Sequence, residues 1–199
     1  MLKLCMNFLR AYIEDKITID DKDWKKVEAL FKKVEYSKGE EICSAGEVCQ
    51  NLYYISKGAA RSYSIDVEGK DSTWAVHYRK NDYTLDPFAG DYVSYLTKTE
   101  SNFFCEALID SVVYVADFEA LDRLYASELK WMTLARNISD MELVTFVQRT
   151  QMLKSLDAKE KYKLLKEIAP VYEEVLSNTQ FASVLGIAPQ SLSRLKGRL

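Results

Sequence analysis

The sequence predicts an α+β protein in which an antiparallel β domain precedes a long helix and a C-terminal helix-turn-helix. Short segments rich in Tyr, Ile and Val alternate with glycine turns between about Val34 and Phe118, a pattern typical of an antiparallel sandwich or barrel. No glycine follows until Gly186, and the apolar residues of the intervening stretch recur at helical spacing. Residues 177–199 then contain two short helical patterns joined at Gly186, as a helix-turn-helix requires.

A short helix and four strands are the first predicted elements. Asp20 or Asp21 is placed to cap the helix. Its apolar face comprises Trp24, Val27, Leu30 and Phe31. The predicted strands are Leu52–Ser56, Arg61–Ile65, Thr73–Tyr78 and Val112–Ala116. The turns predicted around them lie at 37–39, 45–47, 57–58, 68–69 and 89–91, each with a glycine.

A helix around Leu121–Tyr125 and a longer one from about Leu129 to Leu153 follow the strands. Apolar residues cover much of the longer helix: Met132, Ala135, Ile138, Met141, Leu143, Val144, Phe146 and Val147. A helix that is apolar on more than one stripe needs partners on two sides. One side can pack on the β domain and the other on the same helix of a second subunit, so we expect a homodimer. The alternative is that a loop of the same chain covers the second side.

A break after the long helix carries a capping motif. Asp157 would accept a hydrogen bond from the amide of Glu160, whose carboxylate would reach back to the amide of Asp157. The helix that starts at Ala158 should end near Pro170. Asp157 is therefore a candidate hinge between two domains, although local capping alone explains the same residues.

The C-terminal segment has the features of a DNA-reading helix pair. Ser177 can cap a helix over residues 178–185, and Gly186 can take the left-handed conformation that ends it. Pro189 suits the first turn of the next helix, capped by Ala188. The polar, outward side chains of that helix are predicted to contact DNA: Gln190, Ser191, Ser193, Arg194, Lys196 and Arg198. The alternative is an ordinary helical packing unit.

Charge is distributed unevenly along the chain. The formal net charge is −3, but residues 150–199 carry eight basic and five acidic side chains, so the preceding residues carry −6. This asymmetry favours a nucleic-acid-binding module attached to an acidic domain.

Composition and the lengths of apolar segments limit which other classes of protein the chain can belong to. With 199 residues, 48% hydrophobic and 29% charged, the chain should bury a sizeable core. No apolar run reaches the roughly 18 residues of a transmembrane helix, and Arg10 interrupts the apolar start, so we expect neither a membrane partner nor a signal peptide. The expected location is the cytoplasm.

Catalysis and metal binding find little support in the sequence. His77 is the single histidine, whereas metal-dependent oxygenases need clusters of His and carboxylate ligands. No glycine-rich phosphate-binding loop occurs, so no catalytic residue and no metal ligand is predicted. The four cysteines, Cys5, Cys43, Cys49 and Cys105, form no CxxC pair and are expected to be reduced structural thiols. A redox or iron–sulfur role for Cys43 and Cys49 is the alternative.

The chain resembles the cyclic-AMP receptor protein/Fnr family of transcription regulators over roughly residues 20–199. The resemblance rests on KGEEICSAGEVCQNLYYISKGAARSY (38–63), SLDAKEKYKLLKEI (155–168) and FASVLGIAPQSLSRLKGRL (181–199). It implies N-terminal helices and a β-roll sensor over 1–127, a dimerisation helix and hinge over 128–155, and a DNA-binding helix-turn-helix over 156–199 with no wing after it. It also implies palindromic double-stranded DNA and a second subunit as partners, with RNA polymerase as a candidate third.

The effector site departs from the family pattern. Gly90-Asp91 stands where nucleotide-binding members have Gly-Glu, and Ser101-Asn102 stands where they have Arg followed by Ser or Thr. A buried phosphate without its guanidinium partner costs about 2–5 kcal/mol, so we expect an unidentified small-molecule effector rather than cyclic AMP, or none. The alternative function is a ligand-binding or interaction protein whose helix-turn-helix no longer binds DNA.

Overall fold

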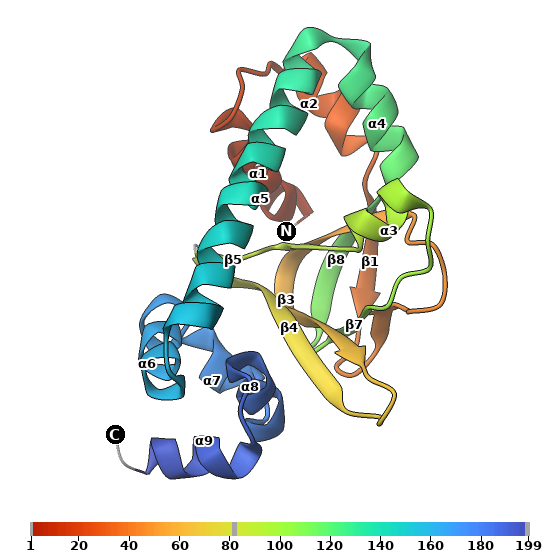
Figure 1. The fold of residues 1–199 in the computed structure, drawn as a ribbon. Coiled ribbons are helices and arrows are strands. Elements are labelled where there is room, and N and C mark those ends of the chain that lie inside the picture. Colours follow the sequence, from red (N-terminus) through yellow and green to blue (C-terminus); the bar gives the residue numbers. More distant parts are fainter. Residues whose placement is uncertain (1, 81–82, 198–199) are drawn as a thin grey trace.

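A computed structural model describes residues 2–80 and 83–197. A long helix, α5 (Leu129–Ser155), connects two groups of elements (Figure 1). One group is a curled antiparallel sheet with helices around the start of α5, and the other is a set of short helices beyond its C-terminal end. The predicted α+β architecture, with its antiparallel β-roll, long helix and C-terminal helices, is therefore confirmed.

All strand pairs of the β-roll are antiparallel. The main path of neighbours is β1-β8-β3-β4-β5, and β2 joins through β7. The strands are β1 (Lys32–Tyr36), β2 (Glu41–Cys43), β3 (Asn51–Ile65), β4 (Asp71–Lys80), β5 (Tyr83–Leu85), β6 (Phe88–Ala89), β7 (Phe104–Ala107) and β8 (Ser111–Asp117).

One strand differs from the prediction. The two strands expected at Leu52–Ser56 and Arg61–Ile65 form a single strand, β3, so the turn predicted at Lys57–Gly58 is wrong. The first half of β3 pairs with β8 and the second half with β4 and β7. Gly58 lies at this change of partners with φ +107°, and a Cβ there would stand 2.3 Å from Ser111 Oγ. The glycine permits a close strand contact instead of a chain reversal.

Helices α2, α6 and α8 begin at their predicted capping residues. They are α1 (Leu2–Glu14), α2 (Asp21–Glu28), α3 (Tyr92–Thr97), α4 (Phe118–Ser127), α5, α6 (Ala158–Ile168), α7 (Val171–Val175), α8 (Asn178–Leu185) and α9 (Pro189–Lys196). Asp20 caps α2 as expected, but the helix ends at Glu28, so the prediction that Leu30 and Phe31 belong to its apolar face is wrong. N-terminal helices were expected without bounds, and α1 is one of them. Helices α3 and α7 were not predicted, because they have only six and five residues.

The long helix α5 is buried along only part of its length. Trp131 and Leu134 pack with α1, α2 and the β-roll in one hydrophobic cluster. Farther along, residues 139–148 are all exposed. None of the described helices has the length and apolar character needed to cross a membrane.

The C-terminal helices pack directly on the β-roll. Val76 and Tyr78 of β4 share a hydrophobic cluster with Phe181 of α8 and Leu192 of α9. Outside this cluster, Ser183 Oγ of α8 accepts a hydrogen bond of 2.7 Å from the backbone N–H of Thr73. Helices α8 and α9 and the sheet therefore share one hydrophobic core.

Candidate nucleic-acid interface

The helix-turn-helix is fixed at each of its ends by local hydrogen bonds. Ser177 Oγ accepts from the amide of Gln180 at 3.2 Å, and the Gln180 side chain accepts from the amide of Ser177 at 2.8 Å. Gly186 adopts the left-handed conformation (φ +71°). Pro189 occupies the first turn of α9, and Ala188 caps it without a side-chain hydrogen bond. These features confirm the predicted caps and turn.

A side chain outside the predicted set holds the two helices together. The side-chain nitrogen Nδ2 of Asn178, at the start of α8, donates to the carbonyl of Pro189 and to Ser193 Oγ, each at 3.2 Å. Ser193 Oγ also donates to the carbonyl of Pro189 at 3.1 Å. Ser193, predicted to contact DNA, thus braces the turn. Sequence spacing did not indicate Asn178, because its partners lie on the following helix.

The outer face of α9 separates into free and engaged side chains. Leu192 is fully buried, whereas Gln190, Ser191 and Arg194 are exposed. Lys196 Nζ lies 3.9 Å from a carboxylate oxygen of Glu173, so its charge is partly compensated. Predicted contact residue Arg198 lies outside the described residues.

Gln190 and Arg194 form the part of this face that is best suited to base edges. They are four residues apart and therefore lie on the same side of α9. Among the described residues, no ion pair engages Arg194. A Gln amide and an Arg guanidinium can each make paired hydrogen bonds to a base in the major groove.

The connection between α5 and α6 has the predicted capping box. Asp157 Oδ1 accepts from the amides of Lys159 at 2.8 Å and Glu160 at 2.9 Å, while Glu160 Oε2 accepts from the amide of Asp157 at 2.8 Å. Leu156 has extended backbone angles that interrupt the helix. The capping is confirmed, and a hinge at Asp157 stays a prediction.

Three of the four predicted effector residues come together at the start of α3. Ser101 Oγ donates to Asp91 Oδ2 at 2.9 Å, and Asp91 Oδ1 caps α3 by accepting from the amide of Ser94 at 2.9 Å. Gly90 precedes this pair with φ +130°, whereas Asn102 is exposed. No ion pair to Asp91 occurs among the described side chains. An anionic ligand would therefore meet an uncompensated carboxylate.

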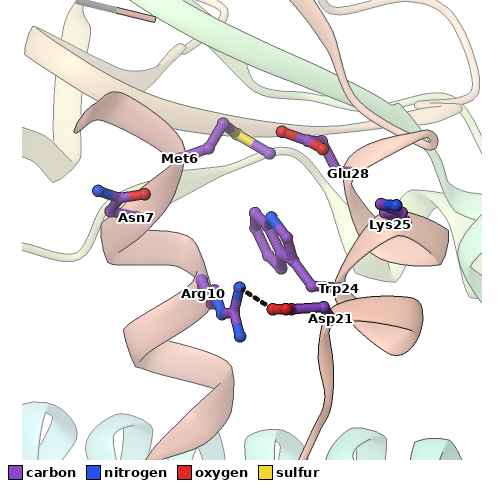
Figure 2. Close-up of a pocket in the computed structure, with 7 residues that line it drawn as sticks. All are labelled: Met6, Asn7, Arg10, Asp21, Trp24, Lys25 and Glu28. Atoms are coloured by element: carbon purple, nitrogen blue, oxygen red, sulfur yellow. Dashed lines mark ion pairs between the residues drawn. The ribbon is translucent and has the colours of Figure 1, made fainter. Parts of the chain in front are cut away.

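A separate cavity of about 370 Å³ lies between α1 and α2 (Figure 2). Its lining residues are Met6, Asn7, Arg10, Asp21, Trp24, Lys25 and Glu28. The Arg10 guanidinium closes one side by pairing with Asp21 at 2.9 Å. This cavity belongs to helices that sequence reasoning did not connect with a site.

His77 is buried in the sheet and contacts two other segments of the β-roll. Its Nε2 lies 2.8 Å from Ser62 Oγ and its Nδ1 lies 2.9 Å from the carbonyl oxygen of Asp86. In the described part of the chain, no group of three or more His, Cys, Asp and Glu side chains is arranged to hold a metal ion.

A buried ion cluster on the sheet was not predicted. Arg61 is 4% exposed, and it donates to Glu106 at 2.7 Å and to Asp71 at 2.7 Å. Its guanidinium also donates to Thr73 Oγ1 at 2.7 Å, beside the backbone bond that docks α8. The cluster therefore stabilises the sheet where the C-terminal helices pack.

Comparison with known proteins agrees with this arrangement. The sequence profile of the cyclic nucleotide-binding domain matches residues 33–128. The fumarate and nitrate reduction regulatory protein of Vibrio cholerae is 24% identical over 180 residues, which cover 84% of this chain and 68% of that protein. Residues 33–128 are thus similar to a cyclic nucleotide-binding domain, and most of the chain is similar to a regulator of the Fnr type.

Solved structures show the same fold. FixK2 of Bradyrhizobium japonicum superposes with a TM-score of 0.63 at 17% identity, over 85% of this chain and 84% of that one. A protein from Eubacterium rectale, described as a transcriptional regulator of the crp/fnr family, gives a TM-score of 0.64 at 14% identity over 90% of this chain and 83% of that one. The β-roll, long helix and C-terminal helices therefore follow one another as in these solved structures.

Proposed function

We propose that the protein is a homodimeric transcription regulator that binds palindromic double-stranded DNA through α9. The observation that carries this proposal is the exposed Gln190 and Arg194 pair on a helix whose opposite side, at Leu192, is fully buried. A rigidly held helix with free hydrogen-bonding side chains is suited to enter the major groove. Ser191 and Lys196, also exposed, are then placed to contact phosphates.

The exposed side of α5 supports the dimer. Met132, Leu143 and Val147 lie on the side of the helix turned away from Trp131 and Leu134, as the 3.6-residue repeat requires. Leu143 is 61% exposed, and Phe146 beside it is 66% exposed. Exposed apolar side chains grouped on one helix face in this way are typical of a protein–protein contact. The second copy of α5 is the natural partner, because a two-fold contact pairs a surface with itself.

The effector proposal is a small molecule other than cyclic AMP. Both oxygens of Asp91 already accept hydrogen bonds, one from Ser101 and one from the amide of Ser94. A neutral or cationic ligand that donates hydrogen bonds could replace the Ser101 contact, whereas a cyclic phosphate would add a second negative charge without a guanidinium.

One observation favours a second candidate, a ligand-binding protein that has lost DNA affinity. Ser193 is engaged by Asn178 and Lys196 lies near Glu173, so fewer side chains remain for phosphates. Phosphate contacts supply much of the affinity of DNA-binding proteins. The two candidates differ directly in whether specific DNA binding is measurable.

Selection of bound sequences from random duplex DNA by the purified protein tests the proposal. We expect an enriched palindrome with half-sites centred about 34 Å apart and binding that weakens steeply with salt. Arg194→Ala should cost roughly 1–3 kcal/mol at each half-site, at least about 30-fold for a dimer. Arg123→Ala, which removes an exposed arginine on α4, is the matched control and should bind like wild type. No enriched palindrome, together with equal binding by both variants, would exclude DNA reading by α9.

A further inference from the structure

A line of buried polar side chains crosses four neighbouring strands of the β-roll. Cys43 of β2 is directly opposite Cys105 of β7, and Cys105 is directly opposite Ser62 of β3. Ser62 Oγ then meets His77 Nε2 of β4 at 2.8 Å. Cys105 is completely buried, and Cys43 is partly exposed at the end of the line. DNA reading and effector binding, as proposed above, use none of these side chains.

The placement of the two cysteines matches the requirements of a disulfide. Residues directly opposite each other on antiparallel strands have Cα atoms about 4.5–5.5 Å apart, and disulfides span Cα separations of about 4.4–6.8 Å. The register of β2 against β7 shifts between Glu41 and Cys43, just before this pair. Side chains directly opposite each other on antiparallel strands lie on the same face of the sheet, so the two thiols are neighbours. Little backbone movement is needed to join them.

The two thiols differ in reactivity. The hydrogen bond from the Cys105 thiol lowers the pKa of Cys43, against the opposing effect of burial, and the backbone N–H of Cys105 adds to the lowering. The hydrogen bond to Cys43 and burial raise the pKa of Cys105 well above its ordinary value. Thiolate is the form that reacts with oxidants. Cys43, which is partly exposed, is therefore the attacking thiol and Cys105 its resolving partner.

We propose that Cys43 and Cys105 are an oxidisable dithiol that a peroxide converts into a cross-strand disulfide. The Cys43 thiolate attacks one oxygen of the peroxide, the O–O bond breaks, and the departing oxygen leaves as water after taking a proton from solvent. Cys43 is now a sulfenic acid. The Cys105 sulfur attacks the Cys43 sulfur, the S–O bond breaks, and the hydroxide leaves as water with the Cys105 proton. Two thiols are oxidised and one peroxide is reduced.

The disulfide would reinforce the wall of the proposed effector site. β2 pairs with β7 alone, and the loop after it is hydrogen-bonded to the Ser101 segment, from the Gly46 amide to the Ser101 carbonyl and from the Ser101 amide to the Glu47 carbonyl, both at 2.9 Å. A bond between Cys43 and Cys105 would fix this edge beside Asp91. The chemistry itself depends on neither DNA nor ligand binding.

Cys49 provides an internal control. Burial raises its pKa, and its sulfur is held between the amide of Asp91 at 3.3 Å and the carbonyl of Asn51 at 3.5 Å. A thiol in this state should react with peroxide more slowly than Cys43.

Peptide mapping of the reduced wild-type chain after equimolar hydrogen peroxide tests the proposal without any substitution. Free thiols are alkylated under denaturing, non-reducing conditions, and the digest is analysed by mass spectrometry. We expect a peptide containing Cys43 linked to one containing Cys105, with loss of two hydrogen atoms and reversal by dithiothreitol. Cys49 should remain alkylated. Free Cys43 and Cys105 after treatment, a bridge from either to Cys5 or Cys49, or a bridge between two chains would overturn the proposal.

Two variants test the assigned roles of the thiols. In Cys105→Ala, the Cys43 sulfenic acid should accumulate and be trapped by dimedone, because its resolving thiol is gone. In Cys43→Ala, Cys105 should stay unmodified by peroxide because it is buried. Dimedone labelling of Cys105 in place of Cys43 would refute the assignment, and circular dichroism checks that each variant is folded. Since the readouts are covalent, failure here would leave the DNA-binding proposal untouched.

Discussion

Truncation of Leu143, an exposed residue of α5, gives the sharpest test of the proposed dimer. Burying a whole leucine side chain contributes about 1.5–3 kcal/mol, and 61% of Leu143 is exposed in the protomer, so a partner could gain roughly 1–2 kcal/mol from it. Leu143→Ala removes most of that side chain from both copies. We expect the free energy of dimerisation to weaken by roughly 1.5–3 kcal/mol, which raises the dimer dissociation constant roughly 10- to 150-fold.

Sedimentation equilibrium over a series of protein concentrations measures this change. Val67→Ala is the matched control, because Val67 is also a fully exposed apolar residue but lies in the turn between β3 and β4. Its dissociation constant should equal that of wild type. A wild-type chain that stays monomeric at every concentration, or equal dissociation constants for Leu143→Ala and wild type, would refute self-association through α5.

Two further predictions concern the fold. Gly58→Ala should lower the free energy of unfolding by about 2–5 kcal/mol in urea titrations, because a Cβ would both clash with Ser111 and occupy a strained backbone conformation. The control Gly69→Ala, also at positive φ but with open space around it, should lower it by only about 1–2 kcal/mol. Equal losses in the two variants would contradict the close-contact explanation. The hydrogen bond from Lys130 lowers the pKa of Asp23 in the folded state. The pair therefore stabilises the folded state above about pH 4, where an unfolded aspartate is ionised. This stability is lost as the pH falls through the lower folded pKa. Asp23→Asn should therefore flatten the acid side of a plot of melting temperature against pH, and an unchanged slope would show that the pair contributes nothing.

The C-terminal motif was predictable because its determinants are local. Ser177, Gly186 and Pro189 each act within one helical turn of their own position, so sequence alone indicates where α8 and α9 begin and end. The brace from Asn178 to Ser193 was not predictable in the same way, because it depends on how the two helices cross. Ser193 was therefore predicted only to contact DNA, whereas its hydroxyl also holds α8 and α9 together.

The β-roll shows the opposite limitation. A glycine after apolar residues normally marks a turn, and the sequence around Gly58 does not reveal that a neighbouring strand approaches closely there. Pairing of Cys43 with Cys105 has the same origin, since the two residues are far apart in the chain and meet only when β2 joins β7. Contacts set by strand order cannot be inferred from residue spacing within one segment.

The shared core between β4 and the C-terminal helices bears on how a signal in the β-roll could reach DNA. Asp157 offers one connection, through the break between α5 and α6. A second runs from β4 into α8, through the hydrogen bond from Thr73 to Ser183 and the cluster that contains Val76 and Leu192. Moving α9 relative to the β-roll would expose that cluster and break that bond, whereas a shift of β4 could move α8 and α9 together. Gly90 and Asp91 directly follow β6, Ser101 precedes β7, and Cys105 lies on β7; both strands pair with β3, the neighbour of β4. The sheet therefore offers a direct physical path from these strands to α8 and α9.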